Sequence, residues 1–309
     1  MINNTKLGTY YDIYSCIREN PRITITYIAK KIGHTGIGRR RATVSTYVHN
    51  MYDSQISLKP NLYFKNLENL LWKAYLCRAK ERNSVGKIFD QLKKDDKITY
   101  VVLISGHSDF FITSRNPFFD VTQYDMEIVE ETQLFSPIFT RPRGWNLPLE
   151  KAARSMINAE FKPGRLSRKT EGIYTLAELD EKIFEIMKKD VRIPFSHVGK
   201  ETGVFSMTVK DHFNKKILSL CNVAHYFFPC GYKNYMQTYF RIHTKYEKSL
   251  VAALEFLPCT SYVYPFDNGF LVNIFHENIN IIMTAFQKME EMGVIKYYTH
   301  YTPLWYEHF

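Results

Sequence analysis

The stretch IRENPRITITYIAKKIG (17–33) recurs in altered form as IMKKDVRIPFSHVGKETG (186–203) in this chain of 309 residues. In each copy an Arg-Ile pair, Arg22-Ile23 or Arg192-Ile193, precedes a helix-like run that ends at a glycine. Weaker matches continue downstream in the same order. An ordered series of matches of this kind is typical of an internal repeat. The sequence therefore predicts a tandem duplication.

Charge alternates along the chain in the same two-part pattern. The segments 1–100 and 151–250 carry net charges of +10 and +8, whereas 101–150 and 251–309 each carry −4. Basic segments suit a polyanionic partner, and acidic segments repel one. The pattern therefore predicts two copies of a basic module followed by an acidic one.

Bulk composition limits the class of protein. The chain is 45% hydrophobic and 15% aromatic, which supports packed cores. Its apolar runs are shorter than the roughly 18–20 residues of a membrane span, and the N-terminal residues lack a signal pattern. Five scattered cysteines argue against a disulfide scaffold. We therefore expect a cytoplasmic protein without a membrane partner.

The predicted fold class is α+β, with two winged helix-turn-helix domains alternating with two ferredoxin-like βαββαβ domains. In the first ferredoxin-like domain we expect a helix at 126–135 and a strand at 136–141. A capping pattern from Thr175 to Glu178 marks the start of the second unit. The expected segments are a first winged helix-turn-helix at 1–68, a ferredoxin-like effector domain at 69–148, a linker at 149–174, a second winged helix-turn-helix at 175–233, and a second effector domain at 234–309.

The third helix of each head is the expected DNA-reading element. In RATVSTYVHNMY (41–52), apolar residues recur at helical spacing and leave a polar opposite face, while 57–66 resembles a wing of two short strands. The equivalent helix of the second head is SMTVKDHFNKKIL (206–218). The predicted DNA contacts are Arg39, Arg40, Arg41, Thr43, Ser45, Thr46, His49 and Lys59 in the first head, and Ser206, Thr208, Lys210 and Lys215 in the second.

The loop GHTGIGRR (33–40) has three interpretations. As a phosphate cradle for a nucleotide it lacks both a preceding strand and the fingerprint of a dinucleotide site or P-loop. It can also be a solvated loop. Arginines at a helix N-terminus favour contact with the DNA backbone. The loop is five residues longer than its counterpart, so we expect the first head to be the stronger DNA contact.

Two segments resemble the leucine-responsive regulator (Lrp/AsnC) family: LDEKIFEIMKKDVRIPFSHVGKETG (179–203) and ISGHSDFF (104–111). The resemblance implies a sequence-specific transcription regulator that binds double-stranded DNA. Its βαββαβ domains would assemble the molecule and bind a small-molecule effector. Gly106 and Asp109 match the family's G-x-x-D pattern, and with Phe111 they form the expected effector site. The resemblance also implies pairing, as a homodimer or as a pseudo-dimer within one chain.

The sirohaem decarboxylases share this plan of domains and give the alternative function, an enzyme that binds a tetrapyrrole. Candidate histidines to face such a ligand are His107, His225, His243 and His300. Known motifs for nucleophilic or metal-assisted hydrolysis are missing from the sequence. The primary expectation is therefore a protein that is not an enzyme, without catalytic residues, metal or cofactor.

Two further groups of residues have alternative interpretations. Cys221, His225 and Cys230 are metal-ligating residue types, but their spacing is poor and a fourth ligand is lacking, so we expect buried thiols and a histidine instead. Aromatic residues near the predicted sheet form either core or the lining of a small-molecule pocket. These are Phe110, Phe111, Phe118, Phe119 and Tyr262.

Overall fold

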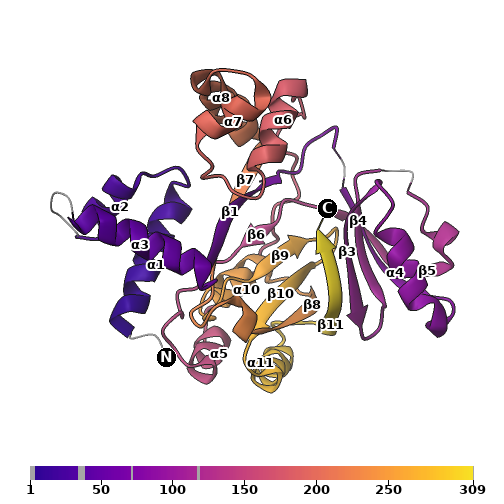
Figure 1. Cartoon of the computed structure of the whole chain (residues 1–309). Coiled ribbons are helices and arrows are strands. Elements are labelled where there is room, and N and C mark those ends of the chain that lie inside the picture. Colours follow the sequence, from indigo (N-terminus) through magenta and orange to yellow (C-terminus); the bar gives the residue numbers. More distant parts are fainter. Residues whose placement is uncertain (1–3, 34–38, 71, 117–118, 309) are drawn as a thin grey trace.

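The computed structural model describes residues 4–33, 39–70, 72–116 and 119–308, with only the backbone described at 4, 39–41 and 306–308. The fold is of the mixed α+β class, as predicted (Figure 1). The first head contains α1 (Asn4–Glu19), α2 (Ile25–Lys31), α3 (Arg39–Asp53) and β1 (Ser57–Phe64). Thr24 caps α2 by accepting a hydrogen bond from the Tyr27 amide, and Gly33 follows the helix with φ +75°.

The second head repeats this arrangement. It contains α6 (Glu178–Met187), α7 (Phe195–Thr202), α8 (Ser206–His212), a π-helical turn (Phe213–Ile217), α9 (Leu218–Leu220) and β7 (Cys221–Phe227). The predicted cap at Thr175 is wrong, because α6 begins after Ala177. Asp180 accepts the Ala177 backbone N–H at 3.1 Å and so satisfies the start of the helix.

The two heads are joined through the strands that we predicted as wings. The expected two-stranded wing at 57–66 is wrong: β1 is one strand, and it pairs antiparallel with β7 of the other head. The Arg22 guanidinium donates to the carbonyls of Val191 and Ile193. Reciprocally, Arg192 donates to the carbonyls of Pro21 and Ile23, at 2.7 and 3.0 Å. This exchange is the pattern of a two-fold interface, here within one chain.

Truncation of either arginine is expected to weaken the pairing of the heads. Arg192→Ala leaves two carbonyls without their charged donor, which costs about 2 kcal/mol of unfolding free energy. Arg22→Ala should cost more, because the Arg22 guanidinium also lies 3.8 Å from the centre of the Phe195 ring. Urea unfolding measures both, with the exposed Arg154→Ala as control. Losses no larger than that of the control would contradict the role of these arginines.

A single nine-stranded sheet joins the two ferredoxin-like parts, in the order β5-β2-β4-β3-β11-β8-β10-β9-β6. The first part contains β2 (Trp72–Ala79), α4 (Val85–Leu92), β3 (Ile98–Ser105), β4 (Phe110–Ser114) and β5 (Met126–Leu134). The second contains β8 (Met236–His243), α10 (Glu247–Leu254), β9 (Tyr262–Pro265), β10 (Phe270–His276), α11 (Ile279–Glu291) and β11 (Tyr297–His308). The second part has the predicted βαββαβ order, and β11 pairs with β3 to connect the halves.

The first part differs from the prediction after β4. The segment predicted as a helix at 126–135 is strand β5, preceded only by a short 3₁₀ turn (Val121–Tyr124). Its β-branched residues fit a strand, and its side chains hold the two halves together. Glu130 accepts hydrogen bonds from the Arg241 guanidinium at 2.6–3.2 Å, and the backbone N–H of Gln133 donates to the Asp267 carboxylate at 2.8 Å.

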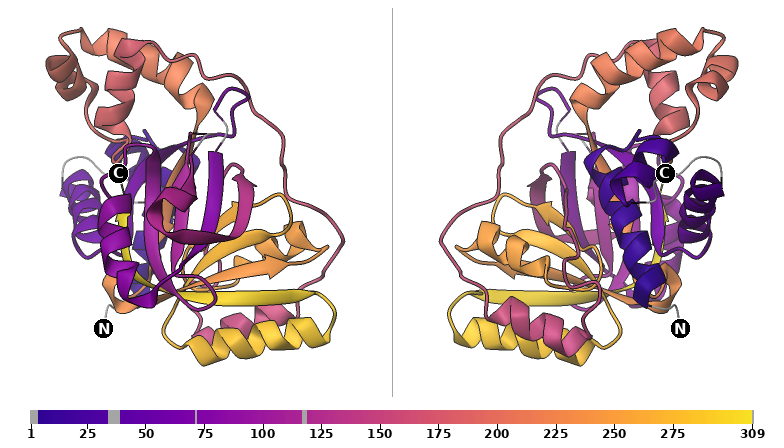
Figure 2. Two further views of the ribbon diagram at one scale, coloured as in Figure 1. Left: turned by 90° about the vertical axis from the view of Figure 1, so that its right-hand side faces the viewer. Right: turned by 90° about the vertical axis from the view of Figure 1, so that its left-hand side faces the viewer.

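The predicted strand and linker that follow are also wrong in part. The strand at 136–141 is only Ile138–Phe139 (β6), which pairs with β9 of the other half. The segment predicted as a linker from residue 149 begins with helix α5 (Leu149–Ile157), which packs on α11 and α10 (Figure 2). Leu149, Ala153 and Met156 are buried there, so the apolar side of α5 explains its position.

Packing between the two halves buries the inner faces of their strands against each other. Ala74, Leu76, Val102 and Phe111 of the first half share a core with four residues of the second half, which are Tyr239, Phe266, Leu271 and Tyr301. Separate cores lie under α4 and under α5, α10 and α11. Among the described residues, no helix is both long and apolar enough to cross a lipid bilayer.

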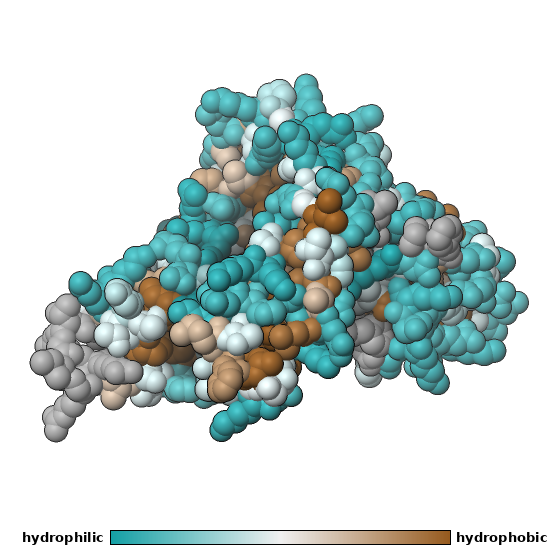
Figure 3. All heavy atoms as spheres, turned by 90° about the horizontal axis from the view of Figure 1, so that it is seen from above, coloured by the Kyte–Doolittle hydropathy of each residue, from teal (hydrophilic) through white to brown (hydrophobic). Residues whose placement is uncertain are grey.

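The surface seen from above is mostly hydrophilic, and its hydrophobic side chains form several small groups near the middle (Figure 3). The segment between α5 and α6 runs along the outside of the molecule towards the second head (Figure 2). Arg168 fixes this segment by a two-point ion pair with Glu247, at 2.7 and 2.9 Å. This ion pair therefore ties the connecting segment to α10.

Candidate functional site

A cavity of about 350 Å³ lies where the second head, β1 and the first half of the sheet meet. Its volume is within the range of small-molecule sites, roughly 300–1,000 Å³. The lining comes from β1, β2, β3, β4, β9, α6 and the segment 134–137, so distant parts of the chain form it together. We call it the Arg115 cavity.

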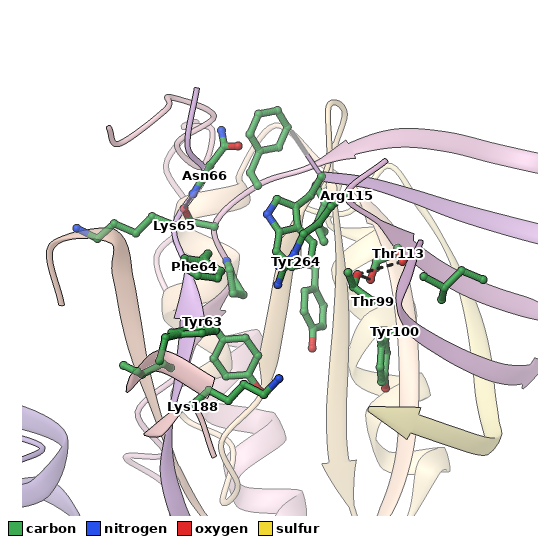
Figure 4. A pocket seen from close by; sticks show the side chains of 18 of the residues that line it. Tyr63, Phe64, Lys65, Asn66, Thr99, Tyr100, Thr113, Arg115, Lys188 and Tyr264 are labelled. Atoms are coloured by element: carbon green, nitrogen blue, oxygen red, sulfur yellow. Dashed lines mark hydrogen bonds between the residues drawn. The ribbon is translucent and has the colours of Figure 1, made fainter. Parts of the chain in front are cut away.

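Three cationic side chains line the Arg115 cavity, and two of them have acidic partners. The Lys188 ammonium lies 2.6 Å from Glu185, and the Lys65 ammonium lies 3.9 Å from Glu171. In Figure 4 Lys188 extends towards the middle of the cavity, whereas Lys65 extends away from it. These pairs leave the two lysines partly neutralised.

Arg115 differs from the two lysines. Its guanidinium lies 4.3 Å from the Trp72 ring centre and 5.3 Å from that of Phe64, and no carboxylate among the described residues forms an ion pair with it. The Arg115 residue counts as exposed by its surface area, yet partial burial of the guanidinium among its neighbours lowers its pKa. An arginine held on aromatic rings beside an open cavity suits a planar anion or a carboxylate.

The remaining walls are aromatic or carry hydroxyl groups. Phe64, Trp72, Phe111 and Phe184 supply flat apolar surface. The Thr99 and Thr113 hydroxyls are 2.8 Å apart (Figure 4). Tyr63, Tyr100 and Tyr264 lie at one end, and burial raises the pKa of each phenol, so all three are neutral at neutral pH. The cavity therefore suits a planar, partly apolar ligand with anionic groups.

The predicted effector residues are only partly at this cavity. Phe111 lines it, but Gly106 and Asp109 do not. The Asp109 carboxylate accepts the Ala79 backbone N–H at 2.9 Å and so caps the end of β2. Gly106 has φ +137°, and a side chain there would approach the His300 carbonyl of β11 to 2.9 Å. Both residues therefore shape a turn next to β11.

On the predicted DNA face of the first head, α3 buries Val44 and Met51 and exposes Thr43, Thr46 and His49, while Ser45 is half-buried. The side chains of Arg39, Arg40 and Arg41 lie outside the described residues, as do Gly36 and Gly38 of the preceding loop. Lys59 lies on β1 at the junction of the heads, 2.8 Å from Asp190, and its charge is therefore not free for DNA.

On the second head, Ser206 and Lys210 are exposed and Thr208 is half-buried. Lys215 lies 3.3 Å from Asp211. Lys216 lies 3.0 Å from the buried Asp180, which also binds His212 at 2.5 Å. These ion pairs reduce the positive potential of the second head.

The candidate metal residues do not form a metal site. Cys221 and His225 are buried, whereas Cys230 is exposed. In the part of the chain that the structure describes, no three His, Cys, Asp or Glu side chains are grouped to hold a metal ion. His107, His243 and His300 also lie outside the Arg115 cavity.

Of the aromatic residues that we predicted as either core or pocket lining, some lie in the core and others line a cavity. Phe110 and Phe119 are packed in the core under α4, and Phe118 lies outside the described residues. Tyr262 lines a smaller internal chamber beside the Arg115 cavity. Arg115, Trp72 and the tyrosines of the cavity were not predicted from the sequence.

The fold is similar to that of the siroheme decarboxylase NirDL. Over 96% of this chain and 91% of NirDL the TM-score is 0.54, at 9% sequence identity. The complex of NirDL with an iron-uroporphyrin III analogue gives the same TM-score at 8% identity, over 96% and 92% of the chains. E. coli AsnC matches 44% of this chain and 92% of its own length, at 17% identity and a TM-score of 0.32. No family model matches the sequence, and no curated protein is similar to it.

This comparison overturns our expectation that the chain is not an enzyme. Two solved structures that share its fold over almost its whole length are those of a decarboxylase. The absence of known catalytic motifs therefore does not exclude enzyme activity for this arrangement of domains.

Proposed function

We propose that this chain binds a carboxylate-bearing tetrapyrrole in the Arg115 cavity and decarboxylates it. The observation that carries the proposal is Arg115, a guanidinium stacked on Trp72 beside an open cavity, with no ion-pair carboxylate among the described residues. The similarity of fold to NirDL, which is named as a siroheme decarboxylase, supports the class of ligand.

The lining suits one side of such a ligand, whose macrocycle is larger than the cavity of about 350 Å³ and would extend beyond it. A flat macrocycle matches the aromatic walls of Phe64, Trp72 and Phe111, and its carboxylates match the Arg115 guanidinium. The buried Asn66 side chain keeps its carbonyl oxygen without a hydrogen-bond partner in the described residues. It lines the same cavity and can accept a hydrogen bond from a ligand. None of the cavity residues is a histidine, so an iron ligand from this lining is not part of the proposal.

Decarboxylation makes limited demands on the protein. A carbon–carbon bond breaks, carbon dioxide leaves, and the remaining carbon takes up a proton. The neutral tyrosines at the end of the cavity can donate that proton, and Arg115 can orient the ligand through another carboxylate.

The direct test is turnover by the purified chain. Sirohaem is incubated with the protein, and loss of carbon dioxide from the macrocycle is followed by mass spectrometry. We expect decarboxylated product to accumulate in proportion to enzyme concentration. Bound sirohaem that is recovered unchanged would reject the reaction and leave only ligand binding.

A second function, sequence-specific regulation through DNA binding by the first head, is supported by a separate observation. Helix α3 presents Thr43, Thr46 and His49 to solvent, directly after the backbone of Arg39–Arg41. Polar side chains on such a helix suit base edges and phosphates. Because β1 and β7 pair with each other, we assign no DNA contact to the wings.

DNA binding predicts a steep dependence on salt, because each neutralised phosphate releases counterions. Replacing the three arginines should lower affinity for duplex DNA far more than replacing three lysines of the second head. Fluorescence anisotropy at two salt concentrations measures this, and equal losses in the two triple variants would contradict the assignment to the first head. The variants are Arg39→Ala with Arg40→Ala and Arg41→Ala, and Lys210→Ala with Lys215→Ala and Lys216→Ala.

A further inference from the structure

A second internal space of about 100 Å³ adjoins the Arg115 cavity. It shares Tyr63, Tyr100 and Tyr264 with the Arg115 cavity. In Figure 4 the rings of these three residues lie in the lower part of the Arg115 cavity. A single water needs only roughly 10–15 Å³ of such space, so the volume is enough for a carboxymethyl group. We call it the tyrosine chamber. Its lining consists of Leu58, Asn61, Tyr63, Tyr100, Tyr226, Tyr232, Gln237, Tyr239, Tyr262, Tyr264 and Asn273.

The tyrosine chamber is polar but carries no charge. All eleven residues of its lining are described by the structure, and none is a lysine, arginine, histidine, aspartate or glutamate. The hydroxyls of Tyr63 and Tyr226 are 2.9 Å apart, and those of Tyr100 and Tyr239 are 3.1 Å apart. The cations of this region instead line the Arg115 cavity next to it.

Asn273 shows that the polar network of the chamber is incomplete. Its amide nitrogen donates to the Gln237 side chain at 2.9 Å, and Gln237 in turn donates to the Tyr232 hydroxyl at 2.9 Å. The Asn273 carbonyl oxygen is buried and has no hydrogen-bond partner among the described residues. Buried polar groups are normally satisfied, so such a group indicates a place for water or a ligand.

The difference in charge between the two spaces suits selective decarboxylation. A carboxylate paired with a guanidinium is stabilised and therefore loses carbon dioxide reluctantly. A carboxylate moved into a neutral chamber loses solvation, whereas the transition state is less affected because its charge spreads as neutral carbon dioxide forms. The unpartnered carbonyl oxygen of Asn273 disfavours the negative charge further.

We propose that the tyrosine chamber receives the carboxylate arm that is cleaved, while Arg115 holds a carboxylate that is retained. This inference rests on the proposed function. The bond between the carboxylate carbon and its neighbour breaks, and carbon dioxide leaves. The electron pair stays on the neighbouring carbon, which takes a proton from the Tyr100 hydroxyl at the boundary. Tyr100 recovers a proton from Tyr239, which is replenished from solvent.

Two variants test the chamber separately from the ligand site. Tyr239 and Tyr226 line the chamber but not the Arg115 cavity, and phenylalanine keeps their ring volume. In Tyr239→Phe and Tyr226→Phe, iron-uroporphyrin III should bind within about twofold of the wild-type affinity. Carbon dioxide release from sirohaem should be slower, by roughly 10- to 100-fold in Tyr239→Phe, whose hydroxyl serves the proton transfer. The exposed Tyr27→Phe is the matched control.

The outcomes separate the chamber from the proposed function. Turnover in both variants equal to that of Tyr27→Phe, with an active wild type, would overturn the chamber alone. A wild type that neither binds iron-uroporphyrin III nor releases carbon dioxide would overturn the proposed function and the chamber together. Melting temperatures close to that of the wild type, measured on the same samples, show that the variants are folded.

Discussion

Arg115→Ala is expected to weaken binding of iron-uroporphyrin III by about 100-fold, because it removes the guanidinium that we assign to a ligand carboxylate. The fold should be unaffected, since the interactions of Arg115 with the described residues are its stacking on Trp72 and Phe64 and longer-range charge effects. Arg115→Lys should give an intermediate loss, because lysine keeps the charge but not the planar two-point geometry. Absorption titration of the bound macrocycle measures the affinities.

The matched control for Arg115 is a cation of the second head outside the cavity. Lys215 is exposed on the helical segment that continues α8, where it forms an ion pair with Asp211. Salt screens the effect of net charge at a distance. Lys215→Ala should therefore bind iron-uroporphyrin III with an affinity within about twofold of that of the wild type. An equal loss in Arg115→Ala and Lys215→Ala would show that general charge attraction, and not a defined site, holds the macrocycle.

Stability is expected to fall as the pH is lowered below 7. Burial lowers the pKa of His225 to about 3, with smaller effects from the charges of Arg192 and Arg18, and burial lowers that of His276 to about 4. The unfolded chain, with histidine pKa near 6.5, then binds protons that the folded chain excludes. Between pH 7.5 and 5 each histidine should cost about 2 kcal/mol of unfolding free energy, and the pair about 4 kcal/mol.

The structure explains why both imidazoles stay neutral. The His225 ring is stacked on Tyr14 at 4.9 Å and its Nε2 lies 2.9 Å from the Ser57 hydroxyl, while His276 Nε2 lies 2.9 Å from the Thr238 hydroxyl. Urea unfolding at pH 7.5, 6 and 5 measures the slope. The double variant His225→Gln with His276→Gln should be less stable at pH 7.5 and should lose the part of the pH dependence that these two histidines contribute, leaving that of His243, whose pKa burial also lowers to about 4. An unchanged slope in this variant would contradict the assignment, and the exposed His49→Gln is the control.

The repeat could be predicted from the sequence because its key residues are constrained in the same way in both copies. Arg22 and Arg192 each reach across to the backbone of the other head, and Val44 and Val209 are each buried in their own heads. The strands at 72–79, 98–105 and 236–243 are continuous runs of strand-forming residues, so the sequence alone indicates them.

The main error in the fold came from treating the two copies as equal. The pairs Glu130-Glu131 and Glu290-Glu291 occupy corresponding places in the two copies of the sequence, but Glu130 lies on β5 and Glu290 on α11. β5 bonds to the second half through Glu130 and Arg241, a tertiary contact that local sequence does not reveal. In a segment as short as 126–135, the spacing of charged residues does not distinguish a strand from a helix. The contact of Glu130 with Arg241 in the other half is consistent with the strand.

The Arg115 cavity could not be predicted, because its lining comes from segments far apart in the chain. Tyr264 of β9, Lys188 near the end of α6 and Arg115 after β4 meet only in the folded molecule. Tyrosine and tryptophan side chains usually pack in protein cores, so their presence in a sequence does not indicate a cavity. Their large number was the unusual feature that the sequence showed. The basic loop at 33–40 favoured a prediction of DNA binding. Arg115, the cation that lines the cavity, lies in a different part of the sequence.

The most direct test of the ligand assignment is titration of the wild-type chain with iron-uroporphyrin III, followed by the absorption of the macrocycle. We predict a saturable change that reaches its endpoint at one macrocycle per chain, since the assignment places the ligand in the Arg115 cavity alone. A spectrum that does not change on addition of protein, or a response that rises without saturation, would contradict the account.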